Sequence, residues 1–266
     1  MTTLTLLTAS YNSGKTIGDT LRSVAAQTYP GIEHIIIDGA SKDDTLDVVA
    51  REGSHVAKVI SEKDRGIYDA YNKGISHAGG EIIGFINSDD YYAHAGVAAQ
   101  VMELFAHDPA LEAVHADLVY VDQLDTTRVL RHWKSRDCTK GALSLGFIPA
   151  HPTVFLRRSV YEKVGTFDLS YRLAADYEFL LRTFYAFAVK SRYVPEIWVR
   201  MRAGGATGGN FQSILRQNRE IRAAQEKHGV KCSTVMFYGV KIADRLIQRV
   251  RGPFVQAPDL LSAERP

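Results

Sequence analysis

Short apolar runs alternate with amphipathic stretches through the first 90 residues of the chain. The runs are rich in β-branched side chains, which is typical of buried strands, and the stretches between them repeat apolar residues at helical spacing. We expect strands at Leu4–Ala9, His34–Asp38, Val56–Ser61 and Ile82–Ile86, and helices at Lys15–Thr28, Thr45–Arg51 (with Asp44 as its N-cap) and Ile67–His77. This alternation predicts an α/β fold with a sheet of parallel strands.

The rest of the chain follows a less regular pattern. It predicts helices at Val97–Ala106, Ser159–Val164, Leu173–Arg182, Phe211–Lys227 and Val235–Arg251, and strands at Ala113–Val121, Thr127–His132, within His151–Arg158 and at Ser191–Arg202. The two strands before residue 134 read as a hairpin around Asp122–Asp125, and residues 134–150 carry no clear pattern. The glycine-rich stretch at 203–209 is a candidate lid.

Polar side chains follow each of the first four predicted strands. They are Tyr11-Asn12, Asp38, Asp64 and Asp89-Asp90. In open α/β sheets the ligand crevice lies at the carboxyl ends of the strands, so these residues are expected to meet there. The adjacent carboxylates at 89 and 90 repel each other in a low dielectric, and a Mg²⁺ or Mn²⁺ ion would relieve that repulsion. The alternative is a solvated turn after a strand, which the same residue types favour.

The charge of the chain is unevenly distributed. Its 266 residues are 45% hydrophobic and 23% charged, an ordinary globular composition. Residues 209–266 carry ten Lys/Arg and five Asp/Glu, a net charge of +5, whereas the preceding residues carry 22 and 25, a net charge of −3. The predicted helix Val235–Arg251 is basic and amphipathic, which favours contact with a membrane surface. The alternative is a helix packed on the domain with its basic face in solvent.

Cysteine use and hydropathy bear on the compartment. Cys138 and Cys232 form no metal-spaced pair, and a chain of this size needs no disulfide. Neither a signal peptide nor an apolar run long enough to span a bilayer is evident. We therefore expect a cytoplasmic protein, either soluble or peripherally attached to the inner face of the plasma membrane, with no nucleic-acid partner.

Gly14-Lys15-Thr16 resembles the end of a phosphate-binding P-loop after the first strand. The full motif requires glycine six positions before the lysine, and Ala9 occupies that position. A P-loop-like nucleotide hydrolase is therefore the alternative function, and it leaves Asp89-Asp90, His151 and Asp176 without a role.

The order and spacing of these motifs resemble the family 2 glycosyltransferases of bacterial polysaccharide and glycolipid synthesis, which have the GT-A fold. The resemblance covers about residues 4–205. The segments that carry it are Thr8–Asn12, Gln27–Pro30, Glu33–Thr45, Asp64–Gly74, Gly79–Asp90, His151–Thr153, Gly165–Asp168 and Ala175–Glu178. It implies a Rossmann-like, mostly parallel sheet flanked by helices, with a GT-A domain at 1–208 and a basic helical extension at 209–266. Within the domain, residues 1–95 would hold the nucleotide sugar and 96–208 the acceptor.

The resemblance also implies roles for individual residues. Those assigned to the nucleotide-sugar donor are Thr8, Ala9, Tyr11, Asn12, Asp38, Asp64, Arg65, Asn72, Asn87, Ser88 and Asp89. Asp38 would bind the donor's base, and Asp90, together with Asp89, would bind the Mg²⁺ or Mn²⁺ ion. Asp176 matches the family's catalytic base, although the family often has an acidic residue where this chain has Ala175. His151 would touch the acceptor or the diphosphate.

The implied reaction is an inverting transfer of a sugar from a nucleotide-diphosphate sugar to a hydroxyl of a glycan or lipid-linked acceptor. A divalent metal neutralises the leaving diphosphate, and a base takes the acceptor's proton. Each residue also has a structural alternative. Asp38 could cap its own turn, Asp176 and Glu178 could be solvated helix residues, and His151 could be structural.

Overall fold

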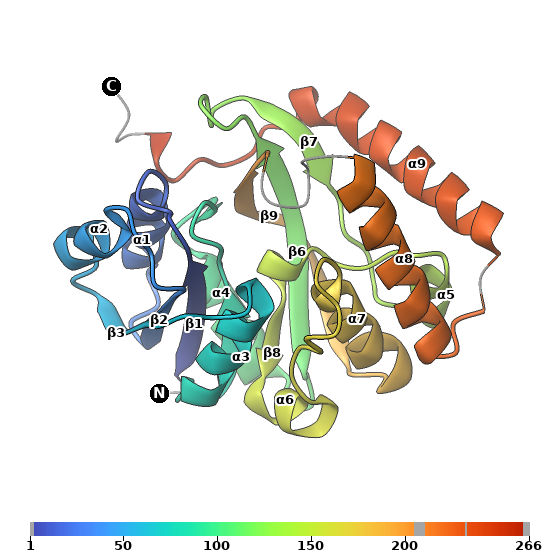
Figure 1. The fold of residues 1–266 in the computed structure, drawn as a ribbon, viewed down its shortest axis with the longest axis horizontal. Helices are drawn as coiled ribbons and strands as arrows, with labels where there is room; N and C mark the ends of the chain where they lie inside the picture. Colours follow the sequence, from blue (N-terminus) through green and yellow to red (C-terminus); the bar gives the residue numbers. More distant parts are fainter. Residues whose placement is uncertain (1–2, 205–210, 232, 263–266) are drawn as a thin grey trace.

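The computed structural model describes residues 3–204, 211–231 and 233–262, which form a central sheet with helices on both faces (Figure 1). The first half alternates strands and helices as predicted. Its strands are β1 (Leu4–Ser10), β2 (Ile32–Asp38), β3 (Val56–Ser61) and β4 (Ile82–Phe85), and its helices are α1 (Ile17–Ala25), α2 (Thr45–Glu52) and α3 (Ile67–His77). The α/β prediction is confirmed.

The sheet reverses its winding between β1 and β4. The strand order is β3-β2-β1-β4, and all three pairings are parallel. Leu21 of α1 and Val48 of α2 pack with Ile36 on one face, whereas Tyr71 of α3 belongs to the core on the other face. A ligand crevice is expected at the carboxyl ends of the two strands that flank such a reversal. Those ends lead into Tyr11 and into Asn87–Asp90.

The second half of the sheet is mixed. It contains β5 (Tyr91–Tyr92), α4 (Val97–His107), β6 (Ala113–Val121), β7 (Val129–Trp133), α5 (Lys140–Ser144), η1 (His151–Thr153), β8 (Phe155–Arg157), α6 (Arg158–Val164), α7 (Ala175–Leu181), η2 (Arg182–Ala186) and β9 (Ser191–Arg202). The strand order continues β4-β8-β6-β9-β5, with β7 paired to β6. Strand β8 is antiparallel to both neighbours, and β6 is parallel to β9. The hairpin of β6 and β7 is confirmed, and the unassigned segment 134–150 contains α5.

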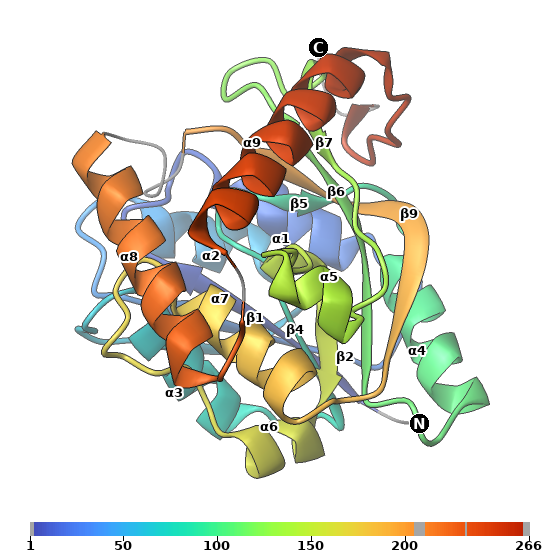
Figure 2. The same ribbon diagram turned by 90° about the vertical axis from the view of Figure 1, so that its right-hand side faces the viewer.

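The C-terminal region adds α8 (Phe211–Lys227), α9 (Thr234–Arg251) and η3 (Gly252–Phe254). Helix α8 packs on α7, and α9 lies along β7 (Figures 1 and 2). Ala224 of α8 and Phe237 of α9 are buried in the same core cluster as Phe179 of α7, so this region is packed on the domain. Gly229 ends α8 with a φ of 69°, a left-handed conformation that glycine adopts without strain. Residues 205–209 of the predicted lid lie outside the described residues.

Candidate active site

The four residues Asn87–Asp90 follow β4 and turn back toward the sheet. Asp90 is fully buried, and its two carboxylate oxygens accept hydrogen bonds from the Arg202 amide (3.1 Å) and the Asn87 side-chain amide (2.7 Å). Its backbone carbonyl accepts a bond from the Thr20 hydroxyl (2.7 Å). Asp89 is half-buried. The chain therefore fixes the orientation of Asp90, and Asp89 is the carboxylate that solvent reaches more easily.

The pKa values of Asp89 and Asp90 are both raised by their surroundings. Burial raises the pKa of each, and the charge of Asp89 raises the pKa of Asp90 further. The guanidinium of Arg202 opposes both shifts and donates to the Asp89 carbonyl at 2.6 Å. Arg202, at the end of β9, supplies one positive charge beside two carboxylates.

This donor set fits a divalent ion that brings other ligands with it. Within the described residues, no three His, Cys, Asp or Glu side chains gather closely enough to hold a metal by themselves. Mg²⁺ is commonly bound by one or two carboxylates together with substrate phosphates and water. Asp89 and Asp90 match that arrangement.

Asp176 lies in the first turn of α7 and accepts a hydrogen bond from the Tyr68 hydroxyl of α3 (3.0 Å). Its Oδ1 also accepts a bond from the Tyr177 amide (2.8 Å). Burial raises the pKa of Asp176, the two hydrogen bonds lower it, and the nearby charge of Glu220 raises it. The result is a carboxylate with raised basicity, held in place from two elements.

Tyr71 connects this carboxylate with the Asn87–Asp90 turn. Its hydroxyl donates to Oδ1 of Asn87. Burial raises the pKa of Tyr71, and the charges of Asp90, Asp176 and Asp89 raise it further. The Tyr71 ring centre lies 6.4 Å from that of Tyr68, the hydrogen-bond partner of Asp176, and the Asn87 side chain also donates to Asp90. These contacts connect Asp176 with the Asn87–Asp90 turn in a single site. Sequence reasoning missed Tyr68, Tyr71 and Arg202. The three-residue spacing of the tyrosines, which puts both on one face of α3, was the available signal.

A second group of predicted donor residues gathers after β1 and β2. The Asn12 backbone is left-handed, with a φ of 50°, and its side chain accepts a bond from the Lys42 amide (2.8 Å). The hydroxyls of Ser13 and Ser88 lie 2.8 Å apart, so a hydrogen bond joins this loop to the turn Asn87–Asp90. The Tyr11 ring is 63% exposed.

Gly39 lies between Tyr11 and Asp64. A Cβ at position 39 would lie 2.6 Å from Oδ2 of Asp64 and 3.3 Å from Cδ2 of Tyr11. The absence of a side chain there leaves a flat aromatic ring next to a carboxylate. That pairing can stack a planar heterocycle and accept its N–H hydrogen bond.

Asp38, predicted to bind the donor's base, is turned toward the residues around its own turn. It is fully buried, and its oxygens accept bonds from the hydroxyls of Ser10 (3.1 Å), Ser41 (2.5 Å) and Ser61 (2.7 Å) and from the Ser41 amide (2.9 Å). With its oxygens turned to the protein, Asp38 holds the turn after β2, which was the structural alternative. Thr8 is also fully buried and lies 3.0 Å from Nε2 of His34. Ala9 is buried in the core.

Asn72 and His151, two other predicted site residues, are turned to structural contacts, and Arg65 lies at the surface. The Asn72 side chain accepts from the Phe167 amide and donates to the Phe167 carbonyl, both at 2.9 Å. Arg65 is exposed and pairs with Asp69 at 2.8 Å. His151 is buried among the rings of three aromatic residues, and burial lowers its pKa to about 3. A neutral, enclosed imidazole does not suit contact with a diphosphate, so its structural alternative is favoured.

The P-loop alternative fails on local geometry. A P-loop cradles phosphate with its backbone amides, but the Gly14 amide donates to a carboxylate oxygen of Asp43 (3.0 Å). Asp43, and not the predicted Asp44, also bonds the first residue of α2, through the Thr45 amide (3.1 Å) and hydroxyl (2.5 Å). The loop is thus occupied by an acidic side chain of the protein.

A hollow of about 480 Å³ opens on the Tyr68 side of the site. It lies between the start of α3 and the loop that precedes α7. Its lining residues are Arg65, Gly66, Ile67, Tyr68, Asp69, Leu169, Tyr171 and Arg172. Because Tyr68 contacts Asp176, a ligand in this hollow would lie beside the predicted base.

Residues 5–165 match the model of the family "Glycosyl transferase family 2", a range that includes Asn87–Asp90 and ends before Asp176. An uncharacterized glycosyltransferase of Mycobacterium tuberculosis is 35% identical over 182 residues, 68% of each chain. A UDP-Glc:alpha-D-GlcNAc-diphosphoundecaprenol beta-1,3-glucosyltransferase of Escherichia coli is 24% identical over 243 residues, 90% of this chain and 94% of its own.

Solved structures show the same fold at low identity. S. aureus TarS 1-349 in complex with UDP-GlcNAc aligns with a TM-score of 0.68 and 17% identity, over 85% of this chain and 66% of that one. A Pyrobaculum calidifontis mannosyltransferase in complex with GDP-Man and Mn²⁺ aligns with a TM-score of 0.60 and 18% identity, over 92% and 80%. The fold is GT-A. The family match and the relative of 35% identity together establish that this chain is a glycosyltransferase and belongs to glycosyltransferase family 2.

Proposed function

We propose that this enzyme transfers a sugar, with inversion and with the help of Mg²⁺ or Mn²⁺, from a nucleotide-diphosphate sugar to a hydroxyl of a glycan or lipid-linked acceptor. The observation that carries the proposal is the series of contacts that links Asp176, through Tyr68 and Tyr71, to Asn87 and Asp90. Relatives named for UDP-Glc transfer and for PGL/p-HBAD biosynthesis support a nucleotide-sugar donor and a role in cell-surface polysaccharide or glycolipid synthesis. Such a role would place the enzyme in the cytoplasm, at the inner face of the plasma membrane.

The donor would lie across the crevice between β1 and β4. Its base would stack on Tyr11 and bond to Asp64, the two side chains that meet beside Gly39. Asp89 and Asp90 would hold the metal and the donor's ribose or diphosphate, while Ser88 and Asn87 keep the turn in place. The ion would supply positive charge to the leaving diphosphate.

Asp176 would take the proton from the acceptor hydroxyl. A base works best when its pKa approaches the working pH, and burial raises the pKa of Asp176 in that direction. A single carboxylate suffices for an inverting displacement, because no glycosyl-enzyme intermediate has to form. The hollow beside Tyr68 would receive the acceptor sugar.

Calorimetric titration with UDP, with and without Mn²⁺, tests the donor half of this proposal. Binding that requires the ion and is lost in EDTA is expected, followed by transfer from one member of a panel of UDP-Glc, UDP-GlcNAc and GDP-Man to α-D-GlcNAc-diphosphoundecaprenol. Lys15→Ala should leave UDP binding unchanged. ATP hydrolysis that Lys15→Ala abolishes would instead support the nucleotide hydrolase.

A further inference from the structure

Helix α9 presents its apolar residues to solvent. Ile242, Leu246 and Val250, spaced four residues apart, form one row along the helix and are 59%, 58% and 68% exposed. Ile247 lies beside this row at 47%. Phe254, just beyond the helix, is 84% exposed. Apolar residues that gather on one exposed face mark an interaction surface.

The opposite face of α9 is fixed to the domain by polar bonds and close packing. Asp244 accepts from Arg136 (2.9 Å), and Gln248 accepts from Nε of Arg131 on β7 (2.7 Å). Phe237 is buried near the helix start. At the other end, a Cβ on Gly252 would lie 2.6 Å from Cα of Arg131, so the helix end sits directly on β7. The helix is therefore held with its apolar row outward, the reverse of a helix that packs through its apolar face.

Positive charge borders the exposed row. Arg245 and Arg249 lie on α9 in the turns that contain Leu246 and Val250, and both are exposed. In the described part of the chain, neither forms an ion pair. The Arg131 guanidinium lies 4.5 Å from the Tyr120 ring centre and 5.1 Å from that of Trp133. Arg131 donates to Gln248, the residue before Arg249 on α9, so it lies against the same helix as Arg245 and Arg249. The charges of Arg245 and Arg249 lower the pKa of Arg131, as burial also does.

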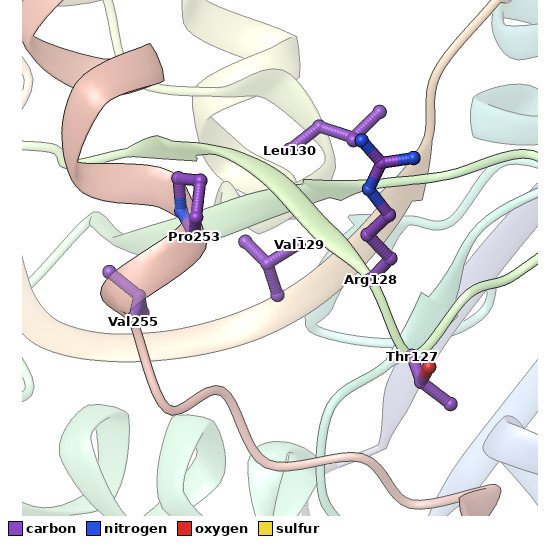
Figure 3. Close-up of a pocket in the computed structure, with 6 residues that line it drawn as sticks. All are labelled: Thr127, Arg128, Val129, Leu130, Pro253 and Val255. Carbon is purple, nitrogen blue, oxygen red and sulfur yellow. The ribbon is translucent and has the colours of Figure 1, made fainter.

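A shallow hollow extends this surface past the end of α9. It has a volume of about 450 Å³, and Figure 3 shows Val129 of β7 pointing toward Pro253 and Val255, with Arg128 at its rim. The surface thus combines apolar side chains with arginines at its border. A bilayer interface with anionic headgroups offers the complementary arrangement, with acyl chains below and phosphates above.

The same surface lies next to the active site. Tyr120, on which Arg131 stacks, precedes Val121, and Val121 pairs with Arg202 of β9. Arg202 in turn bonds the Asp89 carbonyl. The charges of Asp90 and Asp176 both raise the pKa of Tyr120, which agrees with this proximity.

We propose that α9 docks this enzyme on an anionic lipid bilayer, with Ile242, Leu246, Val250 and Phe254 among the acyl chains and Arg245 and Arg249 against lipid phosphates. None of the helices in the described residues is both long and apolar enough to cross a membrane, and docking requires no crossing. Resting on the proposed function, this orientation makes the acceptor a sugar linked to a membrane lipid.

Sedimentation with vesicles tests the docking surface. The full chain should sediment with vesicles of phosphatidylcholine and phosphatidylglycerol, more weakly with phosphatidylcholine alone, and more weakly in high salt. Leu246→Glu should weaken binding at least about tenfold, because burying a leucine stabilises by about 1.5–3 kcal/mol. Val59→Glu, which puts the same charge on an exposed apolar residue of β3 at the far edge of the sheet, should bind like the wild type. Arg245→Gln with Arg249→Gln should abolish the preference for phosphatidylglycerol.

Two outcomes overturn the docking proposal. One is equal vesicle binding by Leu246→Glu and the wild type. The other is a wild-type dimer that Leu246→Glu dissociates while vesicle binding is absent, which would assign the surface to a second copy of the chain. UDP binding with Mn²⁺, measured without vesicles, separates the two proposals. If the protein binds vesicles but not UDP, the docking proposal stands and the proposed function is wrong. If it binds UDP but not vesicles, the proposed function stands and the docking proposal is wrong.

Discussion

The Tyr68 hydroxyl of α3 donates a hydrogen bond to the Asp176 carboxylate of α7 at 3.0 Å, across 108 residues of sequence. This bond joins the parallel half of the sheet, where the donor is proposed to bind, to the half that holds the proposed base. A hydrogen bond to the charged form of a carboxylate lowers its pKa, whereas burial of Asp176 raises it. The bond therefore both positions Asp176 and limits its basicity.

Tyr68→Phe should move the acid limb of the pH–rate profile upward. A hydrogen bond to the charged form of a carboxylate favours that form, so its loss should raise the pKa of Asp176. Transfer should fall on the acid side of the profile and recover at higher pH, with UDP affinity unchanged. Tyr161→Phe is the matched control. Tyr161 is also a buried tyrosine, but it stacks on Phe179, with 5.5 Å between the ring centres, and makes no hydrogen bond to Asp176 in the described part of the chain. An unshifted profile in Tyr68→Phe would mean that this bond does not tune the base.

Asp90→Ala should remove the metal-dependent part of UDP binding. The substitution deletes a carboxylate of the proposed metal site and leaves the Arg202 amide and the Asn87 side chain without their acceptor. The measurement is calorimetric titration with UDP at several Mn²⁺ concentrations. Asp43→Ala, which deletes a carboxylate of the neighbouring loop, serves as the comparison and should keep the Mn²⁺ dependence. If Asp90→Ala keeps wild-type turnover and metal dependence, the turn after β4 is structural.

His151 should make the fold sensitive to acid. Its folded-state pKa is about 3, below the ordinary value of 6.5. Between these two pH values the unfolded chain therefore binds a proton at this imidazole and the folded chain does not. This contribution to stability is complete above pH 6.5 and is lost as the pH falls from there toward 3. His34, with a pKa also lowered to about 3, acts in the same direction.

His151→Phe should remove one of these two contributions while keeping an aromatic ring among Tyr71, Phe85 and Phe167. Between pH 7.5 and 5.5 the wild type should lose about 1.4 kcal/mol more free energy of unfolding than the variant. Urea unfolding at both pH values measures the difference. Equal losses would show that the buried imidazole can be protonated. A large loss of UDP affinity would restore the predicted diphosphate contact.

Glu178→Gln should weaken the fold more than the chemistry. Glu178 is fully buried and accepts bonds from both Nε (3.1 Å) and a terminal nitrogen (3.0 Å) of Arg182, and it lies 2.8 Å from Nε2 of His228. Neutralising Glu178 should lower the melting temperature by several degrees, since Arg182, whose side chain is only 15% exposed, loses its charged partner. Transfer per folded molecule should remain well above that of Asp176→Asn. The opposite ranking of the two variants would make Glu178 the base.

The strands and helices of the first half were predictable because the local spacing of apolar residues marks each of them. Ile67–His77 shows this well, since its apolar spacing, preceding Gly66 and following Ala78-Gly79 mark both ends. The meeting of Asp89-Asp90 with Asp176 was also predictable, through the family resemblance. The mixed pairing of β8 was not, because a three-residue strand carries no periodicity that reports its direction.

The least predictable features are contacts that depend on tertiary structure. Asp38 and Asn72 stand in motif positions, yet their hydrogen-bond partners, among them Ser61 and Phe167, are distant in sequence. The local sequence does not distinguish a carboxylate that binds a ligand from one that caps a turn of its own chain. The amphipathic pattern of Val235–Arg251 identified two faces but not which one meets the domain. Gln248 and Gly252, through their contacts with Arg131, decide that orientation.

Transfer by Asp176→Asn, measured together with its donor affinity, tests the account most directly. The substitution keeps the size of the side chain and the bond from Tyr68 and removes the basicity. With UDP-Glc, Mn²⁺ and α-D-GlcNAc-diphosphoundecaprenol, or whichever donor of the panel is active, the dissociation constant of the donor should stay within about twofold of wild type. The transfer rate should fall by about 10²–10⁴-fold, the usual contribution of a general base. Wild-type transfer by Asp176→Asn, at unchanged donor affinity, would contradict the assignment of Asp176 as the catalytic base.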